Sequence, residues 1–388
     1  MNKSFWLGRF EVCDEGESYL FRDALMPGVK ILPKSLFRGL IGIELDRAFF
    51  AWGFLPICLN PLHGDIKDVP RDPEDLLFWQ FPAKTEAAAY EVHKKINQIR
   101  ALGDVFHCYI GLPWATFIDK KMFPEDLLAT LKVRISGFSY ALKALGVGLR
   151  VHTICQHIYW KQYLQIWETL GVTDLWLPHL REGEQNGLAI KLHPWHLFAA
   201  NLEDPSRSTG LIRGVSPQDK SYLASFIGAH ADHYLSTVRL DLLQLKGEPG
   251  FYIEVLDKWH FEEVVYQHQV AGKPLGQIDQ AGARVHSYNE VLSQSNFALC
   301  PSGAGPNTIR LWEAMGLGSV PVIIGVNPSM PEGGSLQSID WEEIALRFEA
   351  NQVGSLPQIL RKMSFDEIKR RQVLAEKAYA QVRDMTCF

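Results

Sequence analysis

The sequence predicts an α/β protein with two domains, each built on a parallel sheet. Its 388 residues are enough for two domains, and 47% of them are apolar, which is ample for two cores. Short apolar runs typical of buried strands alternate with helix-length segments over 105–198 and again over 222–325. Residues 200–219, between the two series, are polar and rich in glycine and proline. We therefore expect a first domain over 1–205 and a second over 216–360.

The first hundred residues carry weaker periodic signals than the rest. Glycines and prolines predict an irregular segment over 1–35, after which Ser35 could cap a helix over 36–52. Residues 54–83 contain many prolines, so we expect a loop there, part of which could cover a site. An amphipathic helix is predicted over 86–102.

From Val105 onward the elements alternate. A β-rich apolar run covers 105–118, interrupted by Pro113. The following predicted elements of the first domain are strands at 149–156, 173–177 and 189–192, and helices at 127–145 and 159–170. Those predicted for the second domain are strands at 222–227 and 251–256, a turn at 228–230, and helices at 234–245, 261–270, 288–293 and 340–348. Ser364 and Glu367 form a capping box that starts a final helix over 364–385.

The segment 296–325 is the most informative part of the chain. Its predicted elements are a strand at 297–300, a turn at 302–305, a helix at 307–315 and a strand at 320–324. Pro301 ends the first strand because proline cannot donate to a sheet ladder. The turn has little side-chain bulk, so a ligand could approach its backbone closely. Pro306 suits the first position of the helix.

Free amides in this turn and the positive end of the helix dipole would together favour a phosphate. Glu313 lies two turns into the predicted helix, about 9–10 Å from its start, on the same side as Arg310. Its carboxylate could accept the ribose hydroxyls of a nucleotide whose diphosphate lies at the turn. The alternative is an ordinary βαβ unit with a surface glutamate. The predicted donor-binding residues of this segment are Ser302, Gly303, Gly305, Asn307, Thr308, Arg310 and Glu313.

This segment resembles the donor-binding region of exostosin-like glycosyltransferases. The shared features are Cys300-Pro301, a glycine-rich turn, Arg310-Leu-Trp-Glu-Ala314, Gly318 and Pro321-Val-Ile323. The resemblance implies a GT-B architecture, in which two Rossmann-like domains with parallel sheets face each other across a cleft. It also implies a nucleotide-sugar donor in the second domain, and a last helix that packs back on the first domain.

Four further residues of the second domain are candidate donor contacts, since ligands bind beyond the carboxyl ends of parallel strands. Gly228 could let a diphosphate approach the backbone, or could form a plain tight turn. Arg239 could reach a phosphate or could lie on the surface. His260 could bind phosphate or cap a helix, and Arg284 is a further phosphate candidate.

Candidate catalytic residues come from both domains. A transfer with inversion needs a general base, and His157 and Asp119 follow predicted strands. Asp232 could be the nucleophile of a retaining route or could cap the predicted helix at 234–245. The candidate acceptor-binding residues are Trp114, His179 and His193, each of which could also be a packed core or capping residue.

Composition excludes several classes of function. The net charge of −5 gives no electrostatic reason to expect nucleic-acid binding, and no apolar run is long enough to span a bilayer. Six scattered cysteines without CxxC spacing indicate neither zinc nor disulfides, so we expect a reduced, cytosolic protein that could dock peripherally on a membrane. The sequence lacks an Asp-x-Asp motif, so we expect a metal-independent enzyme with no cofactor besides its donor.

The sequence therefore predicts a glycosyltransferase that moves a sugar, from a UDP-sugar as the first candidate donor, to a saccharide or glycolipid acceptor in polysaccharide or glycoconjugate synthesis. Two alternatives stay open. One is a catalytically silent nucleotide- or carbohydrate-binding subunit of a synthase. The other is an epimerase or phosphorylase on the same scaffold. The sequence predicts no oligomeric state.

Overall fold

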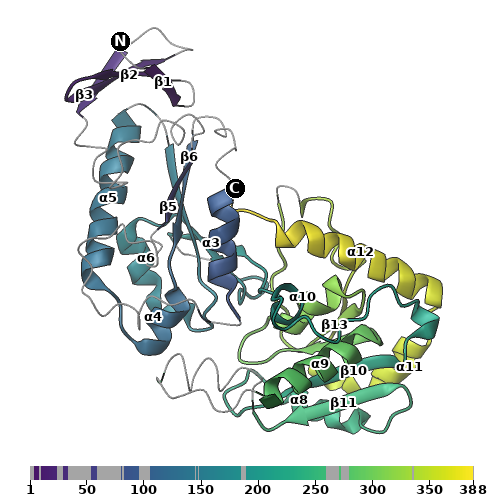
Figure 1. The fold of residues 1–388 in the computed structure, drawn as a ribbon. Helices are drawn as coiled ribbons and strands as arrows, with labels where there is room; N and C mark the ends of the chain where they lie inside the picture. The colour runs from purple at the N-terminus through teal and green to yellow at the C-terminus, as the bar shows by residue number, and fades with distance from the viewer. Residues whose placement is uncertain are drawn as a thin grey trace.

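The structure, a computed structural model, describes residues 4–7, 10–23, 29–33, 54–58, 80, 83–95, 105–144, 146, 148–184, 189–258, 271, 279–333 and 336–387. The helices predicted over 36–52 and 261–270, and the candidate His260, lie outside these residues. The described residues form two five-stranded parallel sheets and one four-stranded antiparallel sheet (Figure 1). The predicted fold class, two parallel α/β units, is confirmed.

The first parallel sheet has the strand order β5-β6-β7-β8-β9. Its strands are β5 (Phe54–Cys58), β6 (Val105–Gly111), β7 (Gly148–Ile154), β8 (Asp174–Leu177) and β9 (Lys191–Pro194). Its helices are α3 (Thr85–Lys95), α4 (Trp114–Lys120), α5 (Glu125–Ala144), the 3₁₀ turn η2 (Trp160–Tyr163) and α6 (Leu164–Leu170). One face packs on α5 and α6, and the other lies against α3.

The second parallel sheet has the order β11-β10-β12-β13-β14. Its strands are β10 (Tyr222–Ala229), β11 (Phe251–Leu256), β12 (Ser295–Pro301), β13 (Val320–Ile324) and β14 (Leu346–Phe348). On one face lie α8 (Val238–Asp241), η4 (Leu242–Leu245), η7 (Ala350–Ser355) and α11 (Leu356–Arg361). On the other lie α9 (Asp279–Ser293), α10 (Ile309–Gly316) and α12 (Phe365–Arg383).

The expectation of an irregular N-terminus was wrong. Residues 4–33 contain an antiparallel sheet of β1 (Ser4–Leu7), β2 (Phe10–Glu15), β3 (Ser18–Asp23) and β4 (Val29–Pro33). This sheet lies beyond one end of α5, away from the second domain (Figure 1). Glycine accounts for the error: Gly16, at φ +64°, forms the turn that joins β2 to β3 and does not end regular structure.

Four other predicted elements also differ. The expected loop over 54–83 begins with β5, which pairs with β6. The helix predicted over 340–348 is instead a turn followed by β14, because pairing with β13 outweighs the helical propensity of that segment. The helix predicted over 234–245 begins only at Val238 and continues as the 3₁₀ turn η4. The β-rich run over 105–118 ends at Gly111, and α4 follows.

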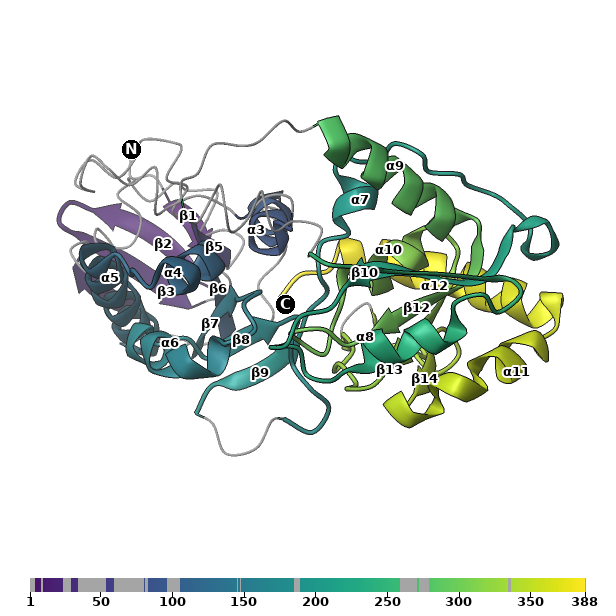
Figure 2. The same cartoon turned by 90° about the horizontal axis from the view of Figure 1, so that it is seen from below.

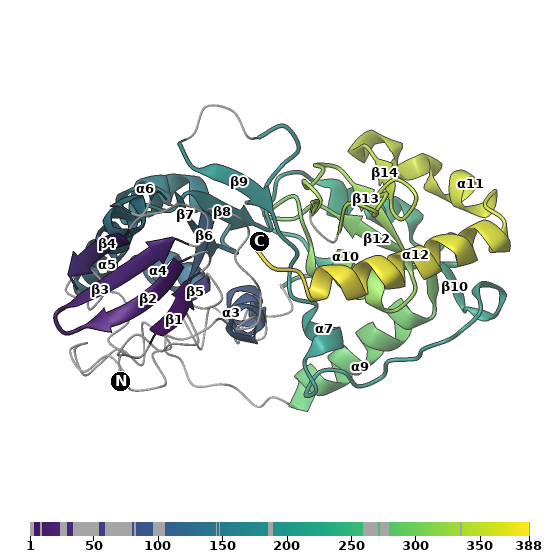
Figure 3. The same cartoon turned by 90° about the horizontal axis from the view of Figure 1, so that it is seen from above.

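The two domains share one hydrophobic core cluster. Trp176 and Trp195 of the first domain and Trp312 of α10 belong to it. Ser364 caps α12 by accepting from the Glu367 amide, as the capping box predicted, and α12 lies along α10. The segment after α12 reaches α3, where the Cys387 amide donates to His93 Nε2 (3.0 Å). Figures 2 and 3 show this C-terminal end between the domains. None of the described helices combines the length and apolar character needed to cross a bilayer.

Candidate functional site

The carboxyl ends of strands from both domains meet at one place, which we call the domain seam. His179 follows β8 and lies against Gly305, which follows β12. The Asn307 amide nitrogen donates to the Pro178 carbonyl (3.0 Å), which ties the same two segments together. Because ligands of parallel sheets bind beyond the carboxyl ends of the strands, we expect a ligand at this seam.

The turn after β12 differs in detail from its prediction. Helix α10 begins at Ile309, after Thr308 at the N-cap position, so Pro306 is not its first residue. The cause is Asn307, whose Oδ1 accepts from the Thr308 amide (2.9 Å) and from Trp312 Nε1 (3.0 Å). Together with the Nδ2 bond to the Pro178 carbonyl, these bonds engage both polar atoms of the Asn307 side chain, which in this structure links the turn to its neighbours.

Only some of the backbone amides in this turn are free, as the anion-site prediction requires. The Ser302 amide donates to the Ile324 carbonyl, and the Gly303 amide donates to the Gly305 carbonyl, each at 3.0 Å. Within the residues that the structure describes, no acceptor is found for the amides of Ala304 and Gly305. Two amides of the turn are therefore left for an anion.

Two buried arginines lie beside this turn. Arg239 of α8 is 8% exposed and donates to the carbonyls of Ser302 (3.1 Å) and Ala229 (2.8 Å). Arg310 of α10 is 7% exposed; it donates to the Ile227 carbonyl and lies over the Phe226 ring at 4.5 Å. The surface alternative for Arg239 was therefore wrong.

Glycines make room for both guanidinium groups. A Cβ atom on Gly303 would lie 2.6 Å from Arg239 Nη2, and one on Gly228 would lie 2.9 Å from Arg310 Nη2. Gly228, predicted to admit a ligand, admits Arg310 instead. No carboxylate forms an ion pair with either arginine in the described part of the chain. Burial and the nearby Arg310 charge lower the pKa of Arg239 to about 10, so it still carries its charge at neutral pH.

Several buried polar atoms around the seam have no hydrogen-bond partner. Each belongs to a segment that follows a strand end, or to α10 behind it. These atoms are His179 Nδ1 after β8, His230 Nδ1 after β10, Ser302 Oγ after β12, Asn327 Oδ1 after β13 and Arg310 Nη1. Other unpartnered buried atoms occur elsewhere, such as indole nitrogens of the core. A buried polar atom without a hydrogen-bond partner destabilises the folded protein. The grouping of such atoms at the seam therefore indicates a place for a polar ligand.

Glu313 does not present an open carboxylate, contrary to the prediction. It is 2% exposed and accepts from the Asn201 amide (2.9 Å) and the Tyr288 hydroxyl (2.6 Å). Burial raises the pKa of Glu313 against these hydrogen bonds, which lower it. The side chain thus joins α10 to α9 and to α7 (Ala200–Glu203).

In the first domain, two candidates come together at the strand ends. Asp119 Oδ1 lies 3.0 Å from His157 Nε2, and the other carboxylate oxygen accepts from Gln80. His157 Nδ1 accepts from the Tyr159 amide (3.0 Å), so Nε2 carries the ring proton and donates it to Asp119. Both nitrogens of His157 are therefore engaged in this structure.

Sequence reasoning missed Glu86, which supports this pair. Glu86 is 4% exposed and accepts from the amides of Ala115 (3.2 Å) and Gln156 (2.9 Å), the residue before His157. It thereby fixes the start of α4, which carries Asp119, to the end of β7. Burial raises the pKa of Glu86 to about 8, which outweighs the two amide hydrogen bonds. Its place in a predicted amphipathic helix gave no sign of this role.

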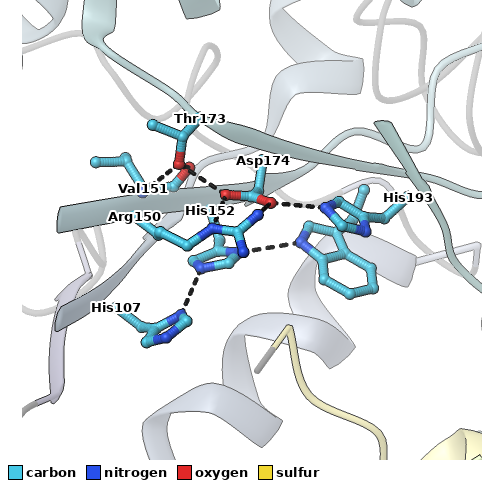
Figure 4. Close-up of polar contacts among 8 residues, drawn as sticks. His107, Arg150, Val151, His152, Thr173, Asp174 and His193 are labelled. Atoms are coloured by element: carbon cyan, nitrogen blue, oxygen red, sulfur yellow. Dashed lines mark hydrogen bonds and ion pairs between the residues drawn. The ribbon is translucent and has the colours of Figure 1, made fainter. Parts of the chain in front are cut away.

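His179 and His193 have different surroundings. Burial lowers the pKa of His179 to about 3, so its ring is neutral where it meets Gly305. His193 does not lie at the seam. It lies within β9, stacks on Trp176 and bonds to Asp174 (2.6 Å), which Arg150 also pairs with (Figure 4). A structural carboxylate thus holds His193 on the sheet face, and its acceptor-binding role stays a prediction.

Asp174 is the centre of that group of polar side chains. Burial raises the pKa of Asp174, but hydrogen bonds from His193, Arg150 and Thr173 outweigh it and hold the pKa below its usual value. His152 bonds to His107 in the same group (Figure 4), and burial holds its pKa well below the usual range. This network stabilises a sheet face of the first domain.

The structure also gives the positions of three other candidates. Trp114 is fully buried and donates to the Thr153 hydroxyl (2.7 Å), so it is a core residue and offers no platform to an acceptor. Asp232 is exposed and does not cap α8, whose N-cap residue is Thr237. Arg284 is exposed on α9, and its phosphate role stays a prediction. In the described ranges, no group of three His, Cys, Asp or Glu residues could hold a metal ion.

Comparison with known proteins agrees with the motif. Residues 198–363 match the family model described as the Exostosin GT47 domain. A "probable glucuronosyltransferase" of Oryza sativa subsp. japonica is 39% identical over 88 residues, which is 23% of this chain and 20% of the relative. A "probable beta-1,4-xylosyltransferase" of Arabidopsis thaliana is 35% identical over 88 residues, 23% of this chain and 21% of that protein. The match thus spans about a fifth of the length of these curated relatives.

Solved structures give weaker likenesses. The pneumococcal O-GlcNAc transferase GtfA, in complex with UDP and GlcNAc, aligns with 76% of this chain and 56% of its own, at 10% identity and a TM-score of 0.33. Sucrose-phosphate synthase from Thermosynechococcus elongatus aligns with 76% of this chain and 74% of its own, at 11% identity and a TM-score of 0.35. At these scores the likeness adds nothing to the fold described above. The exostosin resemblance is confirmed by the family match over residues 198–363, the part of the chain that holds the second parallel sheet and both buried arginines.

Proposed function

We propose that this protein is a glycosyltransferase whose second domain binds the diphosphate of a nucleotide-sugar and whose first domain presents a saccharide or glycolipid acceptor. One observation carries the proposal: Arg239 and Arg310 are both buried beside the turn after β12, and neither forms an ion pair with a carboxylate among the described residues, although the Glu313 charge acts on Arg310 from farther away. A diphosphate supplies the negative charge and acceptor oxygens that two guanidinium groups match. Ser302 Oγ and Arg310 Nη1, both unpartnered, would bind it.

The same arginines would assist the chemical step. When the bond to the donor sugar breaks, negative charge grows on the leaving diphosphate, and fixed positive groups in a buried site stabilise it. We propose that the two arginines perform this role without a metal ion. Activity should then be unchanged in EDTA, whereas a metal-dependent enzyme would lose it.

For the general base we propose the pair of Asp119 and His157. Asp119 accepts the Nε2 proton, which leaves Nδ1 as the basic nitrogen. Nδ1 would exchange the Tyr159 amide for the acceptor hydroxyl and take its proton. The ribose contact predicted for Glu313 would require its carboxylate to release Tyr288 or Asn201, so it stays a prediction.

One rival keeps a specific observation in its favour. A catalytically silent nucleotide-binding subunit would not need a free base, and both nitrogens of His157 are engaged. Such a protein would bind nucleotide but form no product with any acceptor.

Calorimetry of the full chain against UDP, GDP and CMP tests the donor site, and one of them should bind. UDP-glucuronic acid and UDP-xylose are the first donors to assay, because relatives carry glucuronosyl- and xylosyltransferase names. Transfer to an acceptor would separate the enzyme from the silent subunit. If none of the three nucleotides binds, the proposal fails.

A further inference from the structure

A polar cavity of about 870 Å³ opens between the two domains. One wall is Arg181, Glu182 and Gly183, in the loop between β8 and β9. The opposite wall is formed by residues of the segment 329–347, which joins β13 to β14. The volume lies within the range of roughly 300–1,000 Å³ that is typical of small-molecule sites.

The cavity continues directly from the domain seam. Its first-domain wall begins two residues after His179, and its second-domain wall begins two residues after Asn327. Between these points the Ser329 amide donates to the Leu180 carbonyl (2.8 Å), and Arg181 pairs with Pro328 in an antiparallel bridge. A molecule in the cavity would therefore lie next to the strand-end groups to which we assign the donor.

Negative charge predominates in the lining. Four carboxylates face two guanidinium groups: the acids are Glu182, Glu332, Asp340 and Glu342, and the bases are Arg181 and Arg347. Arg347 is already neutralised, since it pairs with Glu182 across the domains (2.6 Å) and with Glu342 (2.9 Å). Glu332, Asp340 and Arg181 form no ion pair in the described part of the chain, which leaves two unpaired carboxylates against one unpaired guanidinium group. An anionic ligand would therefore meet more negative than positive charge, because the single unpaired guanidinium group of Arg181 does not offset the carboxylates.

The rest of the lining suits an uncharged sugar. Trp341 lies in the wall, half-buried, with its indole nitrogen held by the Pro331 carbonyl (2.9 Å), so its ring is fixed in place. An aromatic face beside amide and hydroxyl side chains, here Gln337 and Ser338, offers both apolar surface and hydrogen bonds. Carboxylates add strong acceptors for sugar hydroxyl groups.

We propose that this cavity receives the acceptor and that the acceptor is an uncharged saccharide, not a uronate-, sulfate- or sialate-bearing one. This inference rests on the proposed function, because it assigns the second substrate of the same site. The cavity therefore selects by charge as well as by shape.

The test uses the full chain, saturated with whichever of UDP, GDP or CMP binds, on an array of neutral and anionic glycans. Neutral glycans should bind, and anionic glycans of the same length should bind at least about tenfold more weakly at low salt. The double variant Glu332→Lys and Asp340→Lys should narrow that difference. Glu168→Lys, an exposed change on α6 outside the cavity lining, is the matched control and should leave it unchanged.

Equal or tighter binding of anionic glycans, selectivity that survives the double variant, or the absence of any bound glycan would each overturn the inference. Nucleotide affinity separates the two proposals. If the nucleotide binds the wild type and the double variant equally, the donor proposal stands whatever the array gives. If no nucleotide binds, the donor proposal itself fails.

Discussion

Replacement of Arg310 by methionine should separate ligand binding from folding. In the free protein the variant loses a cation–π contact with Phe226, worth about 0.5–2 kcal/mol, and a hydrogen bond to the Ile227 carbonyl, worth about 1 kcal/mol. It also removes a buried charge that repels Arg239, which favours the variant, and that attracts Glu313, which disfavours it. These effects oppose each other, so the free energy of unfolding should change by no more than about 1 kcal/mol.

Nucleotide affinity should respond much more strongly. If Arg310 Nη1 bonds to the diphosphate, its loss removes a charge-assisted contact in a buried site, at a cost of about 2–4 kcal/mol. The dissociation constant would then rise roughly 30- to 1,000-fold. Calorimetry with the binding nucleotide measures this value, and chemical denaturation measures stability in parallel.

Arg383→Met provides the matched control. Arg383 is an exposed arginine at the end of α12 that pairs with Asp384 (3.1 Å). Its replacement should leave the nucleotide affinity unchanged. The reasoning is refuted if Arg310→Met binds the nucleotide as the wild type does, or if both variants lose affinity equally.

Three further changes test the supporting structure. Gly305→Ala would place a Cβ atom against His179, so the domain seam must shift, and the midpoint of thermal unfolding should fall. The control is Gly354→Ala, whose new Cβ atom would meet only a flexible side chain at 3.3 Å, and this variant should leave the midpoint nearly unchanged. Glu86→Gln should abolish one pH-dependent contribution to the free energy of unfolding. Because the pKa of Glu86 is raised in the folded protein, this contribution is fully present below about pH 4.5 and is lost as the pH rises through about 8. Denaturation midpoints of the wild type should therefore fall, relative to those of the variant, between about pH 5 and pH 8, and parallel curves would contradict this. Trp114→Ala should cost about 3–5 kcal/mol of stability by denaturant unfolding, and a nearly neutral effect would contradict its place in the core.

Buried strands and capping signals made much of the fold predictable. The apolar runs that became β12 and β13 are short and bounded by proline and glycine, and the Ser364 capping box marks the start of α12. The antiparallel sheet over 4–33 escaped prediction because its glycine turn resembles a loop signal. The segment over 340–348 has helical propensity, and only its pairing with β13 makes β14 a strand.

The location of the candidate site could be predicted from the sequence, but its buried positive charges and the orientation of Glu313 could not. The strand-end rule gave the turn after β12, His157 and His179. Burial of two like charges could not be foreseen, because arginine is normally exposed and the space for it comes from distant glycines such as Gly228. Nor could the sequence show that Glu313 would turn towards Tyr288, since that depends on how α9 packs on α10.

The most direct test is a crystal structure of the full chain with the nucleotide that calorimetry selects. We predict phosphate oxygens within hydrogen-bonding distance of Arg310 Nη1 and Ser302 Oγ, with the amides of Ala304 and Gly305 facing the same group. A nucleotide bound elsewhere, or one whose phosphates contact neither Arg310 nor Ser302, would contradict the account.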